Sequence, residues 1–286
     1  MNFEVLEPKS LDEAVSLLNA NPEATRVIAG GQSLLLMIRS GLLMPRFLLS
    51  LNALTEVNEI RVTQQVFNIG ALATHRKILV ALNVAEKINI LPQAVARIGS
   101  TPVRNFGTLG GNLCHNEMGS DPPAALLVLD AAVECVSASG RRRIPLAEFF
   151  TDYFETSLQP DEILVNVEVP CPPPTLHGVY LKHRFRAGDL AIVGVAAMIS
   201  VREGVCEESR LALAGVGPVP FRVREAENLL QRRNLNNGAV EEAAACAAAA
   251  SDPISDAHAS AEYRRKMVRV FVKRALQQAI KVGDPR

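Results

Sequence analysis

The sequence lacks net charge, long apolar runs and paired cysteines, and each absence removes a class of proteins. Its 286 residues include 30 Lys plus Arg and 30 Asp plus Glu, so the formal net charge is zero. A balanced charge argues against a surface that binds polyanions. The longest basic run is Arg141, Arg142 and Arg143, a cluster typical of a solvated turn. We therefore expect no nucleic-acid partner.

Membrane and secretion signals are also missing. No uncharged apolar stretch reaches the roughly 18 residues that a spanning helix needs. The opening MNFEVLEPKS has no apolar core of the kind found in signal peptides. The five cysteines are dispersed and form no C-x-x-C pair, which favours reduced thiols. The sequence predicts a cytoplasmic protein without a membrane span.

The first half of the chain alternates helices with short apolar strands. Ser10 and Glu13 match a capping box in front of an amphipathic helix that ends before Pro22. The strand TRVI then runs into a glycine pair. Thr74 is placed to cap a helix over HRKILVAL.

A proline-rich stretch, VPCPPPTLHG, cannot belong to a helix or a central strand. We place a domain boundary there, between residues 1–174 and 175–286, with two lobes of about 1–55 and 56–174 in the first part. Alternating strands follow the boundary, and the last third is rich in amphipathic and alanine-rich helices.

The first glycine pair lies in IAGGQSLL, residues 28–35, directly after a strand. Glycines there allow backbone amides to approach a ligand, and successive amides form a concave anion site. An ordinary strand-ending turn is the alternative. The stretch matches neither the dinucleotide fingerprint G-x-G-x-x-G nor a P-loop, because it has no G-K-[ST].

The second glycine pair lies in TLGGNLCHNEMGSD, residues 108–121. Cys114 and His115 are adjacent, so on an extended chain they point to opposite faces and do not converge on a metal. Asp121 before Pro122 is placed to cap a helix. The same aspartate could instead bind a ligand hydroxyl.

Taken in order, AGGQSL, TLGGN, the aspartate nine residues later, EILVNVEVP and YLKHRFRAGDLAIVGVAA resemble one family. That family is the FAD-binding subunit of the molybdenum hydroxylases, relatives of xanthine dehydrogenase and carbon monoxide dehydrogenase. The resemblance covers essentially the whole chain. It implies an α+β fold, with a two-lobed FAD-binding domain of the vanillyl-alcohol-oxidase/PCMH type, then a small antiparallel sheet with a C-terminal helical bundle.

The resemblance also implies the residues that contact FAD and their roles, with no catalytic or metal-binding residue among them. Two sets would surround the pyrophosphate: Ala29, Gly30, Gly31, Gln32, Ser33 and Leu34, and Thr108, Leu109, Gly110, Gly111 and Asn112, with Ile98 packing nearby. Asp121 would hold a ribityl or ribose hydroxyl, Leu164 would contact the ring system, and Lys182 would lie near the pyrimidine end. A solvated strand lysine is the alternative for Lys182.

By the same resemblance, this chain would pass electrons from two [2Fe–2S] clusters on a small subunit to an external acceptor. A large subunit with the molybdopterin cofactor would hydroxylate the substrate, an N-heteroaromatic or related small molecule, within a dimer of heterotrimers. A self-contained FAD-dependent reductase or oxidase and a flavin-free interaction protein are the alternatives. The chain departs from many relatives at Leu36, Ser50 and Leu190, where those have proline, aspartate and an aromatic residue.

Overall fold

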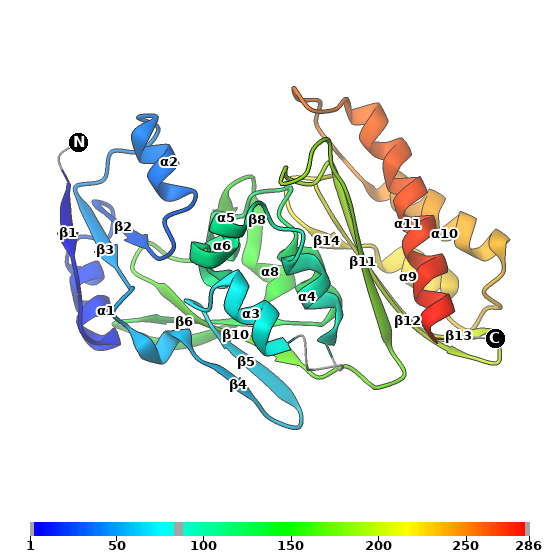
Figure 1. The fold of residues 1–286 in the computed structure, drawn as a ribbon, viewed down its shortest axis with the longest axis horizontal. Helices are drawn as coiled ribbons and strands as arrows, with labels where there is room; N and C mark the ends of the chain where they lie inside the picture. The colour runs from blue at the N-terminus through cyan, green and yellow to red at the C-terminus, as the bar shows by residue number, and fades with distance from the viewer. Residues whose placement is uncertain (1–2, 83–87, 284–286) are drawn as a thin grey trace.

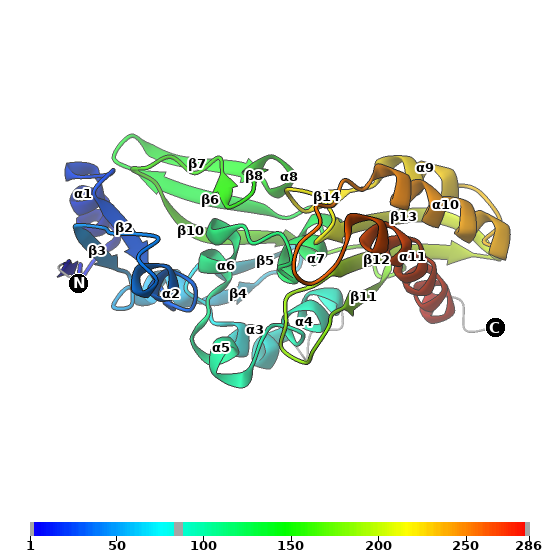
Figure 2. The same cartoon turned by 90° about the horizontal axis from the view of Figure 1, so that it is seen from above.

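The computed structural model describes residues 3–82 and 88–283, which form three main sheets in a row along an elongated molecule (Figure 1). A three-stranded sheet lies at the N-terminal end, a five-stranded sheet in the middle, and a four-stranded sheet with its helices at the far end (Figure 2). Within the described ranges, no helix combines the length and the apolar character that crossing a membrane requires.

The N-terminal lobe is a parallel sheet in the order β1-β3-β2, with helices in both connections. Its elements are β1 (Glu4–Leu6), α1 (Leu11–Ala20), β2 (Thr25–Ile28), α2 (Leu34–Arg39) and β3 (Phe47–Ser50). The expected cap of α1 is present, since the Ser10 hydroxyl accepts a hydrogen bond from the Glu13 amide at 3.2 Å. The Glu13 carboxylate reaches back to the Lys9 amide, one residue earlier than a standard capping box.

The central sheet is antiparallel in the order β4-β5-β10-β6-β7. Its strands are β4 (Ile60–Val62), β5 (Val66–Gly70), β6 (Ala132–Ser137), β7 (Gly140–Pro145) and β10 (Ile163–Pro170), and the 3₁₀ turn η1 (Thr55–Asn58) precedes them. β10 lies in the middle and buries alternate side chains, as a central strand should.

The expected basic turn at Arg141, Arg142 and Arg143 is wrong, because these residues form the edge strand β7. They are paired with carboxylates of neighbouring strands and loops, Glu134, Glu162 and Glu168. These pairings hold the arginines in an extended conformation, and charged side chains also protect a sheet edge from further pairing.

A layer of short helices packs beside the central sheet, and part of it contacts the C-terminal sheet (Figure 2). The helices are α3 (His75–Leu82), α4 (Ile90–Val95), α5 (Thr101–Phe106), α6 (Leu109–His115) and α7 (Pro122–Val128). Thr74 caps α3 as predicted, accepting from the Lys77 amide at 3.1 Å. After α7 and β7, α8 (Leu146–Phe149) leads into a small hairpin of β8 (Phe150–Asp152) and β9 (Glu155–Thr156).

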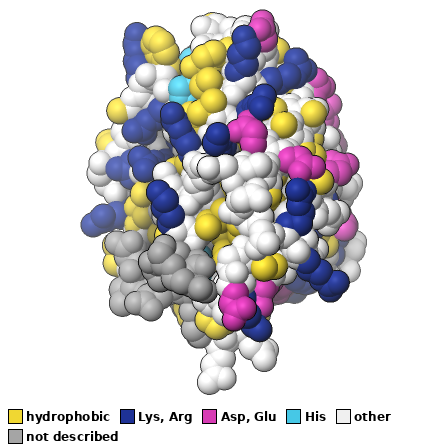
Figure 3. Space-filling view, turned by 90° about the vertical axis from the view of Figure 1, so that its right-hand side faces the viewer, with side chains coloured by type: hydrophobic (Ala, Val, Ile, Leu, Met, Phe, Trp, Pro, Cys, Tyr) yellow, Lys and Arg dark blue, Asp and Glu magenta, His cyan; other side chains and the backbone are white. Residues whose placement is uncertain are grey.

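The C-terminal sheet is antiparallel in the order β11-β12-β13-β14 and is covered on both faces. Its strands are β11 (His177–His183), β12 (Val193–Arg202), β13 (Val205–Ala214) and β14 (Phe221–Arg222), and its outer helices are α9 (Arg224–Leu230), α10 (Asn237–Ala250) and α11 (Ala261–Gly283). Burial on both faces explains why β12 is apolar along most of its length. Basic and acidic side chains are both spread over this end of the molecule (Figure 3).

Arg264 of α11 connects this outer helix to the loops at the end of the C-terminal sheet. Its guanidinium is buried and donates to the carbonyls of Ile192 at 2.8 Å and Gly215 at 2.9 Å, and to the Asp256 carboxylate at 2.6 Å. The Gly215 amide in turn donates to the Met118 carbonyl at 2.7 Å. One side chain therefore links the last helix to the segment just before α7.

We expect Arg264→Met to lower the free energy of unfolding by about 3 kcal/mol, because two buried carbonyls and a carboxylate lose their donor. Urea unfolding measures the change. Arg265→Met is the matched control: Arg265 pairs with Asp252, whose side chain is 90% exposed, so its loss should cost less than about 1 kcal/mol. Equal losses in both variants would contradict the role given to Arg264.

Candidate functional site

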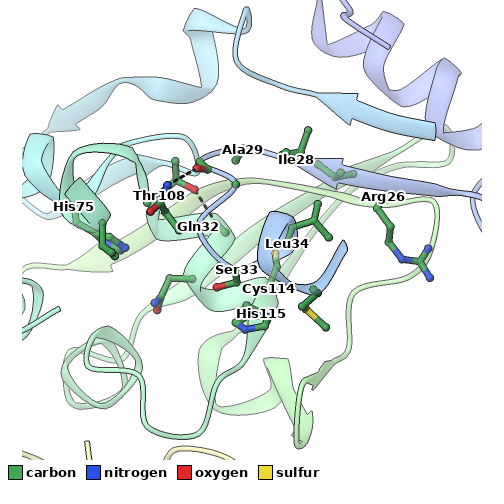
Figure 4. A pocket seen from close by; sticks show the side chains of 18 of the residues that line it. Arg26, Ile28, Ala29, Gln32, Ser33, Leu34, His75, Thr108, Cys114 and His115 are labelled. Carbon is green, nitrogen blue, oxygen red and sulfur yellow. Dashed lines mark hydrogen bonds between the residues drawn. The ribbon is translucent and has the colours of Figure 1, made fainter. Parts of the chain in front are cut away.

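A cavity of about 460 Å³ opens between the N-terminal lobe and the helical layer (Figure 4). That volume is within the range of small-molecule and cofactor sites. The predicted residues that line it are Ala29, Gly30, Gly31, Gln32, Ser33, Leu34, Ile98, Thr108, Gly111 and Asn112. The other predicted residues, Leu109, Gly110, Asp121, Leu164 and Lys182, lie outside its wall.

The first glycine motif forms a loop between the end of β2 and the start of α2. Gly31 has φ of +66°, a conformation that favours glycine. In the described structure the amides of residues 31–34 make no hydrogen bond to a protein acceptor. The Gln32 side-chain amide steadies the loop by donating to the Gly30 carbonyl at 3.0 Å. Consecutive unpaired amides beside a cavity are what an anion-binding nest requires.

Gly30 brings the two glycine motifs together. A Cβ atom at this position would lie 2.0 Å from the Phe106 carbonyl oxygen and 3.0 Å from the Gly107 Cα. No side chain can be accommodated at that separation, because both opposing atoms belong to the backbone. The first loop therefore packs directly on the segment that leads into Thr108.

The second motif begins helix α6, and its first amides are used differently from those of the first motif. The Thr108 hydroxyl caps the helix by accepting from the Gly111 amide at 3.1 Å. The amides of Leu109 and Gly110 donate to the carbonyls of Ala73 and Ala71 at 3.0 and 2.8 Å. These amides are therefore satisfied within the protein, and Gly110 serves the packing of α6, since a Cβ there would lie 2.6 Å from the Ala71 Cβ.

Asn112 supplies the polar side chain of the second motif. Its backbone amide bonds to the Thr108 carbonyl at 3.0 Å, as in an ordinary helix. The Ser120 hydroxyl donates to its side-chain oxygen at 2.8 Å. With the oxygen held in this way, the Asn112 Nδ2 group remains as a donor at the cavity wall.

Cys114 and His115 lie in α6, so the expectation of an extended chain there is wrong. Both line the cavity, and the His115 ring packs against Phe154 of the β8–β9 hairpin at 5.2 Å. Burial raises the pKa of the Cys114 thiol to about 12, which disfavours the thiolate that a metal would need. In the described part of the chain no group of three His, Cys, Asp or Glu side chains is placed to hold a metal ion.

Asn116 anchors the hairpin that carries Phe154. It ends α6 in the left-handed conformation, with φ of 43°. Its side-chain amide donates to the carbonyls of Asp152 at 2.7 Å and Glu155 at 2.9 Å. The hairpin is therefore fixed to the same helix that begins at Thr108.

Asp121 and Lys182 form a buried ion pair instead of facing the cavity. Their carboxylate and ammonium groups are 2.7 Å apart, with side chains 3% and 2% exposed. The Tyr180 hydroxyl also donates to Asp121, at 2.7 Å. Burial raises the pKa of the Asp121 carboxyl, and the Lys182 ammonium opposes that rise. The predicted helix starts at Pro122 as expected, but the Asp121 side chain does not cap it, because Tyr180 and Lys182 take up its oxygens.

Leu164 is buried in β10, where it pairs with Cys135 of β6 and belongs to the central hydrophobic core. Leu190 is exposed, in the loop between β11 and β12. Neither residue lines the cavity.

His75 is a cavity residue that the sequence analysis missed. It is 2% exposed, and its backbone amide donates to the Gly107 carbonyl at 3.0 Å. Burial, with a smaller contribution from the Arg104 charge, lowers the pKa of its imidazole to about 4. The sequence does show a histidine directly after the helix cap Thr74. Its burial could not be predicted from there, because it depends on contact with Gly107, which is distant in the sequence.

Comparisons with known proteins agree over the whole chain. Residues 1–172 match the family described as the FAD binding domain in molybdopterin dehydrogenase, and residues 179–279 match the CO dehydrogenase flavoprotein C-terminal domain. The alpha subunit of the 6-hydroxypseudooxynicotine dehydrogenase complex of Paenarthrobacter nicotinovorans is 34% identical over 99% of this chain and 96% of its own. The carbon monoxide dehydrogenase medium chain of Afipia carboxidovorans is 32% identical over 97% and 96%.

Solved structures give the same result. A chain of carbon monoxide dehydrogenase from Hydrogenophaga pseudoflava superposes with a TM-score of 0.95 at 32% identity, covering 98% of this chain and 97% of that one. Quinoline 2-oxidoreductase from Pseudomonas putida 86 gives 0.94 at 31% identity, covering 99% and 98%. The predicted fold class is thereby confirmed.

The neutral imidazole of His75 should make the protein sensitive to acid. The folded state holds this pKa near 4 against 6.5 in the unfolded chain, so stability is lost as pH falls from about 6.5 towards 4. Between about pH 7 and 4.5 we expect wild type to lose about 2 kcal/mol more than His75→Phe. Urea unfolding at both pH values, without flavin, measures the difference. Parallel pH profiles would contradict it.

Proposed function

Because the chain belongs to the FAD-binding subunits of the molybdenum hydroxylase family, we propose that it is the electron-transfer subunit of such an oxidoreductase. It would receive electrons from [2Fe–2S] clusters on a small partner subunit and deliver them to an external acceptor. A large subunit with the molybdopterin cofactor would carry out the hydroxylation.

The structural observation that carries the FAD site of this proposal is the run of unpaired amides at residues 31–34 on the wall of the cavity. A pyrophosphate has only acceptor oxygens and negative charge, which these donors complement without a lysine or arginine. Thr108, Gly111 and Asn112 line the same cavity, with Asn112 Nδ2 as a further donor. When bound, FAD supplies a redox centre that exchanges electrons singly or in pairs.

Asp121 and Lys182 would contribute as a buried ion pair. An ammonium group has three protons, and Lys182 uses two of them, on Asp121 and on the Arg97 carbonyl. The third N–H has no acceptor among the described residues, and we assign it to the pyrimidine end of the flavin, although Lys182 is buried and does not line the cavity in this structure. The contacts of Asp121 with a hydroxyl and of Leu164 with the ring system stay part of the proposal on the family resemblance alone, because neither residue lines the cavity. No general acid or base is assigned, because electron transfer needs none.

The partners and the substrate class belong to the same proposal. Relatives are named as dehydrogenases or oxidoreductases of 6-hydroxypseudooxynicotine, caffeine and quinoline, and others of glyceraldehyde and carbon monoxide. We favour an N-heteroaromatic or related small molecule as the substrate of the holoenzyme, bound on the large subunit, and a dimer of heterotrimers as the assembly.

The whole-complex proposal predicts the composition of the protein purified from its native source. We expect flavin absorbance on a broad iron–sulfur background, molybdenum and iron in the same sample, and two further chains. Visible spectroscopy with metal analysis and gel electrophoresis measures all three. Flavin alone on a monodisperse, fully active single chain would instead support a self-contained reductase or oxidase.

The amide nest predicts a specific loss of FAD binding. Gly31→Val forces a β-branched residue to φ of +66°, so the loop must rearrange and its amides turn away. We expect the FAD affinity of the flavin-free chain to fall at least about tenfold in a fluorescence titration. Gly204→Val is the matched control, at φ of +77° in open space away from the cavity. Unchanged affinity in Gly31→Val, or equal loss in both, would disprove the nest.

A further inference from the structure

His75 has no assigned role, and neither of its ring nitrogens has a partner among the described residues. Nδ1 is sealed from solvent and unpaired. Nε2 also makes no hydrogen bond. Unlike Nδ1, it is not fully buried, so it is the ring nitrogen that stays accessible. A histidine that lines a cavity with an unpaired nitrogen is positioned to bind whatever fills the cavity.

The imidazole lies where the two glycine motifs meet. A Cβ at Gly107 would lie 3.0 Å from the His75 Cδ2 atom and 3.3 Å from Nε2, so the ring edge packs on the residue before Thr108. Gly30 packs on the same segment, against the Phe106 carbonyl and the Gly107 Cα. Figure 4 shows His75 beside Thr108 at one side of the cavity. The ring therefore lies on the cavity wall beside Thr108, in a cavity that residues 31–34 also line.

The position of the proton follows from burial. A sealed N–H without an acceptor is among the rarest arrangements in proteins, whereas an unmatched acceptor is tolerated somewhat better. The neutral ring therefore carries its proton on Nε2, the accessible nitrogen. The low pKa of His75, near 4, keeps the ring neutral at physiological pH, so it offers one N–H donor and no charge.

We infer that His75 is a ligand-binding residue whose Nε2–H donates to an oxygen of the FAD pyrophosphate. The inference rests on the proposed function, because FAD is the ligand assigned to the cavity. It adds a side-chain donor between the two glycine motifs, on a helix fixed by the Thr74 cap. The three donor groups, the 31–34 amides, Asn112 Nδ2 and His75 Nε2, then approach the pyrophosphate from different elements.

The test compares four full-length flavin-free chains: wild type, His75→Phe, His75→Gln and His75→Asn. Calorimetric titrations use FAD, ADP as a pyrophosphate probe without flavin, and riboflavin as a flavin probe without phosphate. We expect His75→Phe to weaken FAD and ADP by about 10- to 100-fold, the cost of one hydrogen bond to a charged group, and to leave riboflavin unchanged. His75→Gln should bind close to wild type, because its amide reaches the Nε2 position, whereas His75→Asn ends near Nδ1 and should resemble His75→Phe.

Several outcomes would overturn the inference. Wild-type affinity of His75→Phe for FAD and ADP would do so, as would equal losses for ADP and riboflavin, which indicate general damage to the site. If His75→Phe does not fold, equal affinities of the Gln and Asn variants decide against it. Nitrogen-15 spectra of the imidazole, which should show the proton on Nε2 with ADP bound, give a direct check. Failure of wild type itself to bind FAD would instead refute the proposed function.

Discussion

The contact between Gly30 and the backbone of Phe106 and Gly107 is the constraint on which the site depends. It places a loop of the N-terminal lobe against the segment that starts α6, two parts of the chain separated by some 75 positions in the printed sequence. Because both sides are backbone, the approach is closer than any side-chain packing would allow. The unpaired amides at residues 31–34 are held by it close to the segment that carries the Thr108 cap and contacts the His75 ring.

Much of the architecture was predictable because local patterns and burial agree. β12 reads as a strand because both of its faces are buried, so its apolar run is nearly unbroken. The caps at Ser10 and Thr74 were visible as short-range side-chain patterns and are present. The glycine loop at residues 28–35 was identified from residue type alone, since few other residues adopt its conformation.

The parts that sequence reasoning missed depend on contacts between distant segments. A glycine pair is a poor start for a helix, yet α6 forms there because Ala71 and Ala73 accept its first amides. Tyr180 and Lys182, which belong to another sheet, donate hydrogen bonds to the Asp121 carboxylate, so it does not form the expected helix cap. Neither event leaves a trace in the residues next to the motif, so no local pattern could have shown it.

The proposed recognition loop, made of main-chain amides, also bears on how such subunits diverge. Donors that belong to the peptide backbone are shared by every residue type except proline, so substitutions around them change the lining of the site without removing its hydrogen bonds. Only positions such as Gly30 and Gly31, where geometry excludes a side chain, resist exchange. Drift of this kind is compatible with a relative only 34% identical over nearly the whole chain. If the proposal holds, a few small residues are enough to maintain the hydrogen bonds of the site while its other lining residues change.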